Sequence, residues 1–159
     1  MSAVTNILVP LDFSDASHAA LQYACRLADG LDASLHLLHV VEPAMVASGY
    51  MEVYVPSPEL FERFEEEGRQ LLHDALTAEE RAKYRAVLAQ RTGQPAAEIL
   101  DYVAGHSSVD LIVMATHGRG GVARLLMGSV ADHVVRSAPC PVLTLRNPFE
   151  SVRRGDLAA

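Results

Sequence analysis

The segment that most constrains the fold of this chain spans residues 109–129. It opens with four apolar residues at 111–114, a run too short for a helix and bounded by charge and by glycine. Such a run is typical of a strand buried on both faces, as in parallel sheets. Three of the four residues at 118–121 are glycine, and apolar residues then recur at helical spacing from 130 to 136. A strand, a glycine-rich loop and a helix start predict a cradle for an anion such as phosphate, because backbone N–H groups and the helix dipole favour negative charge there.

The rest of the chain alternates between strands and helices. The first strand, at 5–11, leads into a helix at 16–29 that we expect Ser14 or Asp15 to cap and Gly30 to end. Further strands are expected at 34–41, 84–90, 111–114 and 142–145, and further helices at about 58–76, 95–104 and 130–136. Five strands alternating with helices predict a doubly wound α/β domain, with helices on both faces of a parallel sheet.

Two stretches of this pattern carry expectations of their own. The 58–76 helix has an apolar face that includes Phe64 and Leu71, and Gly68 on that face would let a neighbouring element approach closely. The connection at 43–57 is long for a compact domain and rich in Met, Tyr and Val. Its composition fits a lid or a partner surface, and it also fits a loop that folds over the edge of the core.

Composition is that of a compact soluble domain. Of the 159 residues, 50% are hydrophobic, so we expect one domain at 1–147 and a polar tail at 148–159. The absence of a run of about 18 apolar residues and of a basic-then-apolar leader predicts a cytoplasmic protein without a membrane span. The formal net charge of −7 argues against a nucleic-acid partner, because phosphate backbones need clustered Lys and Arg. Cys25 and Cys140 lack the spacing of metal ligands, and we expect both to be reduced thiols.

A single lysine, Lys83, limits the phosphate chemistry available to the chain. It lies far from the glycine-rich loop in the sequence, and no Gly-x-x-x-x-Gly-Lys-Ser/Thr pattern occurs. The central cation of Walker-type ATPases is therefore missing. Phosphate charge would have to be balanced by backbone N–H groups, by a metal ion, or by Arg119 and Arg124.

The glycine spacing resembles that of the ATP-binding branch of the universal stress protein family. That branch carries Gly, two residues, Gly, nine residues, Gly, and then Ser or Thr. Gly118, Gly128 and Ser129 match the last three positions, whereas Ala115 stands at the first. The resemblance covers residues 7–146 and implies a Rossmann-like sheet of strand order 3-2-1-4-5. The ligand crevice would then open between the ends of the first and fourth strands.

The resemblance also implies a set of binding residues. Asp12, at the end of the first strand, would touch the nucleotide, although the same carboxylate could instead cap the following helix. Pro10, Val40 and Met114 would line the adenine pocket, and Val130 would present a backbone N–H to the phosphates. The implied cofactor is ATP, or AMP or ADP, with or without Mg²⁺. The full set of candidate binding residues is Pro10, Leu11, Asp12, Val40, Met114, Ala115, His117, Gly118, Arg119, Gly128, Ser129 and Val130.

Three kinds of function remain open from the sequence alone. The favoured one is a nucleotide-binding stress or regulatory protein; the others are a slow ATPase or autophosphorylating enzyme, and a nucleotide-free interaction module. His117 has no serine or cysteine nucleophile visibly paired with it, so no catalytic residue is named. Gly118 and Gly128 argue against the nucleotide-free branch of the family. His36 and His39 lie three apart in a strand, so they face opposite sides and cannot chelate one metal.

The last strand is the predicted partner surface. Its residues are Val142, Leu143, Thr144 and Leu145, and they would form an apolar edge beside the fourth strand. An open apolar edge invites pairing with a second copy of the chain. The family commonly pairs in this way, so the resemblance implies a homodimer; a regulatory protein partner is also compatible with the sequence, which does not name one.

Overall fold

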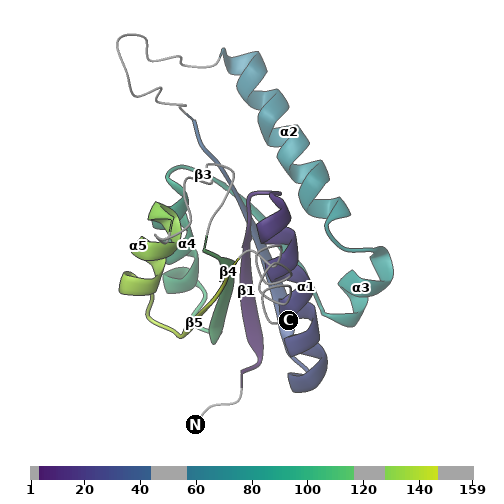
Figure 1. Cartoon of the computed structure of the whole chain (residues 1–159). Helices are drawn as coiled ribbons and strands as arrows, with labels where there is room; N and C mark the ends of the chain where they lie inside the picture. The colour runs from purple at the N-terminus through teal and green to yellow at the C-terminus, as the bar shows by residue number, and fades with distance from the viewer. Residues whose placement is uncertain (1–3, 44–56, 117–127, 147–159) are drawn as a thin grey trace, which may run out of the picture.

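The computed structural model describes residues 4–43, 57–116 and 128–146, which form a three-layer α/β unit (Figure 1). The strands are β1 (Asn6–Leu11), β2 (Ser34–Val41), β3 (Val87–Thr92), β4 (Leu111–Ala115) and β5 (Val142–Leu145). The helices are α1 (Asp15–Leu31), α2 (Pro58–Asp74), α3 (Ala78–Lys83), α4 (Pro95–Gly105) and α5 (Ser129–Ser137). The tail at 148–159, and all but the ends of the 43–57 connection, lie outside the described residues. No helix within these ranges is long and apolar enough to cross a membrane.

The five strands form one parallel sheet of order β3-β2-β1-β4-β5, which confirms the predicted fold. Alternate residues along each strand face opposite layers. In β2, Leu35 and Leu37 pack with α1 and the end of α2, whereas Leu38 packs with α4 and α5. β1 and β2 are almost continuously apolar because both of their faces are covered.

The ladder between β1 and β4 is short. β1 pairs with β2 along its whole length, from Asn6 to Leu11, but it pairs with β4 only at Ile7 and Leu8. Pro10 lies just beyond that point and has no N–H group to donate. The two strands therefore stop pairing before their carboxyl ends, at the place where the strand order reverses. Ligand crevices open at such switch points.

Helix α1 is capped as predicted but ends differently. The Ser17 N–H donates to the Ser14 hydroxyl at 3.2 Å, which makes Ser14 the N-cap. The predicted end at Gly30 is wrong, because the helix runs two residues beyond the predicted 16–29 range, to Leu31, and Asp32 adopts the left-handed φ of 52° that ends it. Aspartate tolerates this conformation better than most residues. Arg85 also holds the turn by donating to the Asp32 carbonyl oxygen at 2.6 Å.

The third strand begins three residues later than predicted. Tyr84 is the C-cap of α3, and Arg85 has a φ of 47°, so the chain is still turning where the 84–90 strand was expected to begin. The Arg85 guanidinium donates to the Ser34 hydroxyl at 3.0 Å and to the Asp32 carboxylate at 3.2 Å, which anchors this turn beside β2. The strand itself lies at the edge of the sheet, in agreement with the implied strand order 3-2-1-4-5.

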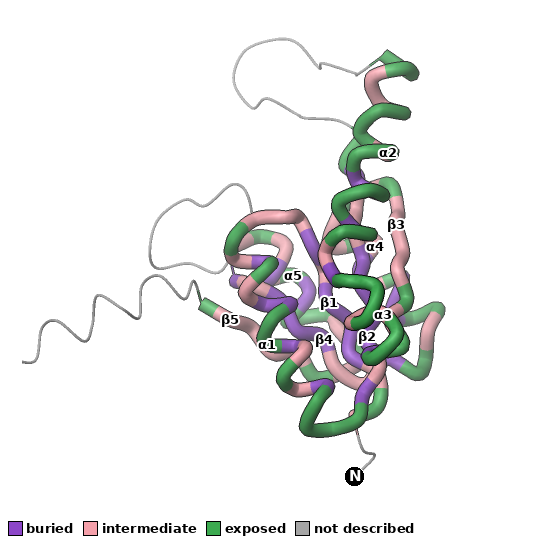
Figure 2. The backbone as a smooth tube through the Cα atoms, turned by 90° about the vertical axis from the view of Figure 1, so that its right-hand side faces the viewer, coloured by how far each residue is buried: buried purple, intermediate pink, exposed green. Residues whose placement is uncertain are grey.

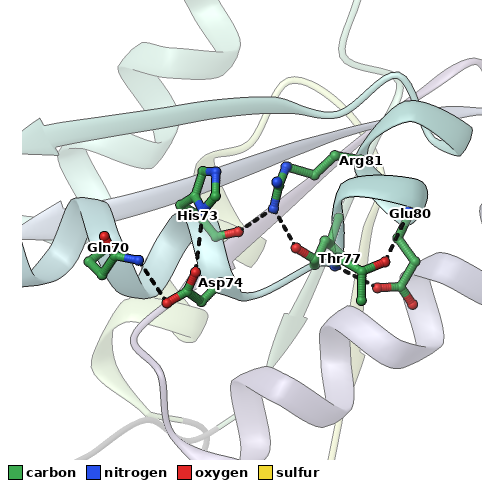
Figure 3. A network of polar contacts seen from close by, with 7 residues as sticks. Gln70, His73, Asp74, Thr77, Glu80 and Arg81 are labelled. Atoms are coloured by element: carbon green, nitrogen blue, oxygen red, sulfur yellow. Dashed lines mark hydrogen bonds and ion pairs between the residues drawn. The ribbon is translucent and has the colours of Figure 1, made fainter.

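A short helix, α3, is absent from the elements predicted from the sequence. Thr77 and Glu80 form a capping box at its start, with the Glu80 N–H 3.1 Å from the Thr77 hydroxyl and the Thr77 N–H 2.8 Å from the Glu80 carboxylate. Arg81 reaches back to the end of α2 and donates to the carbonyl oxygens of His73 and Leu76, each at 2.6 Å (Figure 3). These bonds set the bend between the two helices.

Helix α2 contacts the sheet from Glu65, near its middle, towards its C-terminal end, and its N-terminal part stands clear of the domain (Figure 2). Gly68 is buried against His39 and Gln90, which confirms the predicted close approach. The expectation that Phe64 and Leu71 share that packed face is wrong, since these residues are 43% and 38% exposed. These two side chains lie to one side of Gly68 and Leu72, the residues of α2 that are buried.

One carboxylate joins the start of β1 to the start of β4. Asp110 accepts hydrogen bonds from the Thr5 N–H at 2.8 Å, the Thr5 hydroxyl at 2.8 Å and the Asn6 N–H at 3.1 Å. The bonds from Thr5 are the main reason that the pKa of Asp110 is lowered. The stabilisation from a carboxylate with a lowered pKa is present above its unfolded value and is lost as the pH falls through its folded value.

Candidate functional site

The start of α5 is fixed at the carboxyl edge of the sheet. The Gly128 N–H donates to the Thr116 carbonyl oxygen at 2.7 Å, so the chain returns close to the point where it left β4. Thr116 is in turn held in the sheet, because its N–H donates to the Leu145 carbonyl oxygen at 2.9 Å. Helix α5 therefore begins beside the place where the β1–β4 ladder has already stopped.

The N-terminus of α5 has no side-chain cap among the described residues. Gly128 is its N-cap residue and has no side chain with which to accept a bond from the first turn. The Asp132 N–H makes the first bond of the helix, to the Gly128 carbonyl oxygen at 2.9 Å. The N–H groups of Ser129, Val130 and Ala131 thus have no partner within the helix. With the positive end of the helix dipole, they form an arrangement suited to the oxygen atoms of an anion.

Asp12 lies at the end of β1 and is bound to the following turn. Its Oδ1 accepts hydrogen bonds from the Ser14 N–H at 3.0 Å and from the Ser14 hydroxyl at 2.6 Å. Ser14, and not Asp12, caps α1, so the capping role considered from the sequence is wrong for this carboxylate. The Asp12 side chain is half-buried at the switch point.

The backbone reverses sharply between Asp12 and Ser14. Phe13 has a φ of 62°, a left-handed conformation that is rare for a bulky side chain. Its ring lies 4.5 Å from the His39 ring, centroid to centroid, and His39 Nδ1 donates to the Leu11 carbonyl oxygen at 2.8 Å. Strained backbone persists where its surroundings enforce it, and such residues cluster at ligand sites. This turn follows β1 directly and holds Asp12 at the end of that strand, beside the switch point.

The sheet separates the predicted binding residues by face. Pro10, Val40 and Met114 share, by strand alternation, the face that α4 and α5 cover, and Val130 packs into the same core. Leu11 is 3% exposed and belongs to the core on the other face. The Leu11 side chain is therefore separated from the other candidates, although its backbone ends β1 at the switch point.

Two further candidates lie at the end of β4 and at the start of α5. Ala115 is the last residue of β4 and is half-buried, while Ser129 is the first residue of α5 and is exposed. His117, Gly118 and Arg119 lie outside the described residues, as does Arg124.

The described residues contain no group of three or more His, Cys, Asp or Glu side chains that could hold a metal ion. His36 contacts Tyr102 of α4, whereas His39 contacts Phe13 and lies against Gly68 of α2. This placement on opposite faces confirms the prediction made from their spacing.

Two residues that shape this edge are absent from the candidates predicted from the sequence. Thr116 positions the start of α5. Its place in the sequence could have indicated this role, because it is a polar residue between an apolar strand and the glycine-rich loop. Phe13 gives no comparable signal, because nothing in a phenylalanine indicates a left-handed backbone.

These features define a Rossmann-like α/β domain with a helix N-terminus at its switch point that no described side chain caps. Comparison with known sequences then identifies the particular family. The sequence matches the profile of the Universal stress protein family over residues 3–146, and the chain belongs to that family.

Individual relatives agree with this assignment. Universal stress protein YxiE of Bacillus subtilis is 36% identical over 148 residues, which cover 88% of this chain and 97% of the relative. Universal stress protein MJ0531 of Methanocaldococcus jannaschii is 34% identical over 146 residues, which cover 89% of this chain and 82% of the relative. The solved structure of universal stress protein UspA from Lactobacillus plantarum superimposes with a TM-score of 0.73 at 30% identity, covering 92% of this chain and 100% of that one.

Two more distant solved structures contain nucleotides. A universal stress protein in complex with cAMP has a TM-score of 0.61 at 21% identity, covering 91% of this chain and 98% of that one. The universal stress protein from Archaeoglobus fulgidus in complex with dAMP has a TM-score of 0.55 at 19% identity, covering 90% and 98%. At these identities the likeness concerns the fold alone.

Proposed function

We propose that this protein binds an adenine nucleotide, ATP in the first place, at the switch point between β1 and β4. The observation that carries the proposal is the N-terminus of α5, which presents the N–H groups of residues 129–131 beside the point where the β1–β4 ladder ends. Phosphate oxygens suit such a helix end. The universal stress proteins that were crystallised with cAMP and dAMP support an adenine nucleotide as the ligand.

Each part of the nucleotide has a matching group in the proposal. The phosphates would accept hydrogen bonds from the Ser129 and Val130 N–H groups, and Asp12 would accept one from a ribose hydroxyl. Pro10, Val40 and Met114 would form an apolar wall for the adenine. Mg²⁺ fits only as a companion of ATP, because Mg²⁺ is commonly held by substrate phosphates together with one or two carboxylates. Asp12 would be that carboxylate.

Calorimetric titration with ATP tests the proposal, and substitutions of Ser129 test the phosphate contact. Gly128 has a ψ of 151°, an extended conformation that can precede proline, and position 129 opens α5, where proline is tolerated. Ser129→Pro removes one N–H donor and should weaken ATP binding by roughly tenfold or more, the value of one charge-assisted hydrogen bond. Ser129→Ala removes only the hydroxyl and serves as the matched control.

Adenosine separates phosphate binding from adenine binding. It lacks phosphates, so wild type and Ser129→Pro should bind it equally. ATP binding that is equally strong in the proline and alanine variants would remove α5 from the site. Absence of any adenine-nucleotide binding to the wild type would overturn the function. Steady-state phosphate release would show whether bound ATP is also cleaved.

The homodimer is a separate part of the proposal. Every residue of β5 is half-buried, and β5 is an edge strand paired only with β4. The Pro141 and Leu145 carbonyl oxygens accept bonds from β4, so in a parallel ladder the N–H and C=O of Val142 and Thr144 point to the open edge. A second copy would pair there. The cytoplasmic location and the domain at 1–147 belong to the same proposal.

Thr144→Pro should convert a dimer to monomers, because it removes an outward N–H and leaves the β4–β5 ladder intact. Analytical ultracentrifugation at micromolar concentration measures the change, and Thr144→Val, which keeps the N–H, is the control. A wild type that sediments as a monomer would exclude the dimer.

A further inference from the structure

A histidine is buried between the sheet and α4. His36 is the third residue of β2, is 7% exposed, and has its Nδ1 2.8 Å from the Tyr102 hydroxyl oxygen. Its neighbours in the sheet are Leu8 on β1 and Val87 on β3, and neither side chain can form a hydrogen bond. The hydroxyl of Tyr102 thus gives the buried imidazole of His36 a hydrogen-bond partner.

Tyr102 connects this histidine to a second one. The Tyr102 ring stacks on His106 with centroids 4.0 Å apart and an interplanar angle of 14°. His106 Nδ1 donates to the Tyr102 carbonyl oxygen at 2.8 Å. The rings of His36 and His106 meet edge to face with centroids 6.1 Å apart. The three residues form one packed group that joins β2 to the C-terminal end of α4.

Charged residues from β3 and α4 face this group. From β3, the Arg91 guanidinium carbon lies 5.2 Å from the centre of the Tyr102 ring. From α4, Glu98 pairs with Arg91 at 3.5 Å, and His106 is itself a potential cation. β1 brings no titratable residue to this face. Burial first, and His106 second, lower the pKa of His36.

We propose that His36, Tyr102 and His106 form an acid-sensitive latch, which holds α4 on the sheet at neutral pH and releases its C-terminal end on acidification. Protonation places a cation at His36 in a nonpolar layer, with the ring of His106 6.1 Å away between centroids. Separation of α4 from β2 would let water reach both rings. The latch does not depend on whether a nucleotide binds.

The direction of the effect follows from linkage between protonation and opening. An imidazole in water has a pKa of about 6.5. Above that value His36 is neutral in both the closed and the open state, and the latch is fully effective. Below it, the open state binds more protons than the closed state, because the folded pKa of His36 is lowered, and the closed state loses stability.

The loss of the latch would extend beyond α4. Tyr102 and Val103 belong to the same core as Ala131 and Val134 of α5. Release of α4 therefore removes part of the surface on which α5 rests, which makes the end of the sheet near α5 responsive to pH.

Two measurements on the intact protein test the latch. An NMR titration should show the His36 ring protons changing at a pH clearly below 6.5, the ordinary midpoint. Urea unfolding at about pH 7.5 and about pH 5.5 should show an unfolding constant that rises on acidification by up to about tenfold more in the wild type than in a His36→Phe/Tyr102→Phe variant. The double substitution removes both polar partners together and so leaves no buried hydroxyl unpaired. His133→Gln, at an exposed position of α5, should keep the wild-type response.

Hydrogen exchange locates the opening. Amides of α4 from Ile99 to Gly105 should lose protection at about pH 5.5 relative to those of α1, after correction for intrinsic exchange. A His36 midpoint at or above 6.5 would overturn the proposal. An identical pH response in the wild type and the double variant would also overturn it. If the double variant does not fold, the titration of His36 in the wild type still decides the question.

Discussion

Replacing Gly128 with aspartate is expected to weaken ATP binding by more than about a hundredfold while leaving the fold intact. An N-cap side chain lies over the first turn of its helix and accepts hydrogen bonds from the N–H groups there. The introduced carboxylate would therefore occupy the donors proposed for phosphate and would also repel it. Loss of two charge-assisted bonds, each worth roughly 1.5–3 kcal/mol, accounts for the stated factor.

The folded structure should accept this substitution. Gly128 has a φ of −59° and a ψ of 151°, values that any residue can adopt, so no strain arises from the loss of glycine. Aspartate is also a better N-cap than glycine by a few tenths of a kcal/mol. The variant should thus bind ATP far less tightly and unfold at an equal or higher urea concentration.

Two controls make the result specific. Gly128→Asn has nearly the same shape without the charge, so its ATP affinity should lie between those of the wild type and the aspartate variant. Adenosine should bind all three proteins alike. If ATP affinity is unchanged in a folded Gly128→Asp protein, the phosphates bind elsewhere and the proposed site is wrong.

Replacing Gly68 with valine is expected to destabilise the protein by about 1–3 kcal/mol, the usual cost of overpacking a core. A Cβ at this position would lie 2.8 Å from both Gln90 Oε1 and His39 Cδ2, closer than real contacts allow. Neither neighbour can retreat easily: Gln90 donates to the Glu65 carbonyl oxygen at 3.0 Å, and His39 is bound to the Leu11 carbonyl oxygen at 2.8 Å. Helix α2 must therefore shift away from β2 and β3.

The matched control is the same change in another helix. Gly30 lies in α1, and a Cβ there would meet nothing within 4 Å. Gly30→Val should be neutral or slightly stabilising, because valine has a higher helix propensity than glycine. Urea unfolding of both variants measures the difference. Equal stabilities of the two variants would show that α2 is free to adjust and that Gly68 is not a packing requirement.

The order of the sheet, and with it the switch point between β1 and β4, could be predicted because long-range signals agreed. Apolar runs such as Ile7 to Val9 belong to strands covered on both faces. The glycine spacing around Gly128 resembled that of a known family, and the family implied the strand order. In the structure α5 begins beside the point where the β1–β4 ladder ends, and the phosphate-binding role of this helix start stays a prediction.

The predicted ends of helices and strands were wrong where specific hydrogen bonds, and not the pattern of apolar residues, determine where an element begins or ends. Asp32 ends α1 instead of Gly30 because Arg85 stabilises its left-handed turn, and that partner lies 53 residues away in the sequence. The predicted third strand begins too early because Tyr84 is an aromatic residue of the kind common in strands, whereas in the structure it is the C-cap of α3. The capping box at Thr77 and Glu80 was readable from the sequence and would have predicted α3.

Within the candidate site, the sequence could name residue types but not the faces they occupy. Leu11 follows Pro10 directly, yet one residue along a strand moves a side chain to the opposite core. The strained φ of Phe13 depends on contacts with His39, which no local pattern encodes. The loop residues His117, Gly118 and Arg119 lie outside the described structure, so their roles stay predictions.

The bonds from Thr5 and Asn6 to the Asp110 carboxylate have a consequence for how the chain folds during its synthesis. β1 is a central strand, but its bond partner Asp110 lies 105 residues after Thr5. β2 and β3 can pair as soon as their residues are made, because they follow in sequence order. β1 must wait for more than half of the chain before β4 covers its other edge. A nascent chain therefore carries an exposed central strand for most of its translation, the interval in which unpaired strand edges are most prone to wrong association.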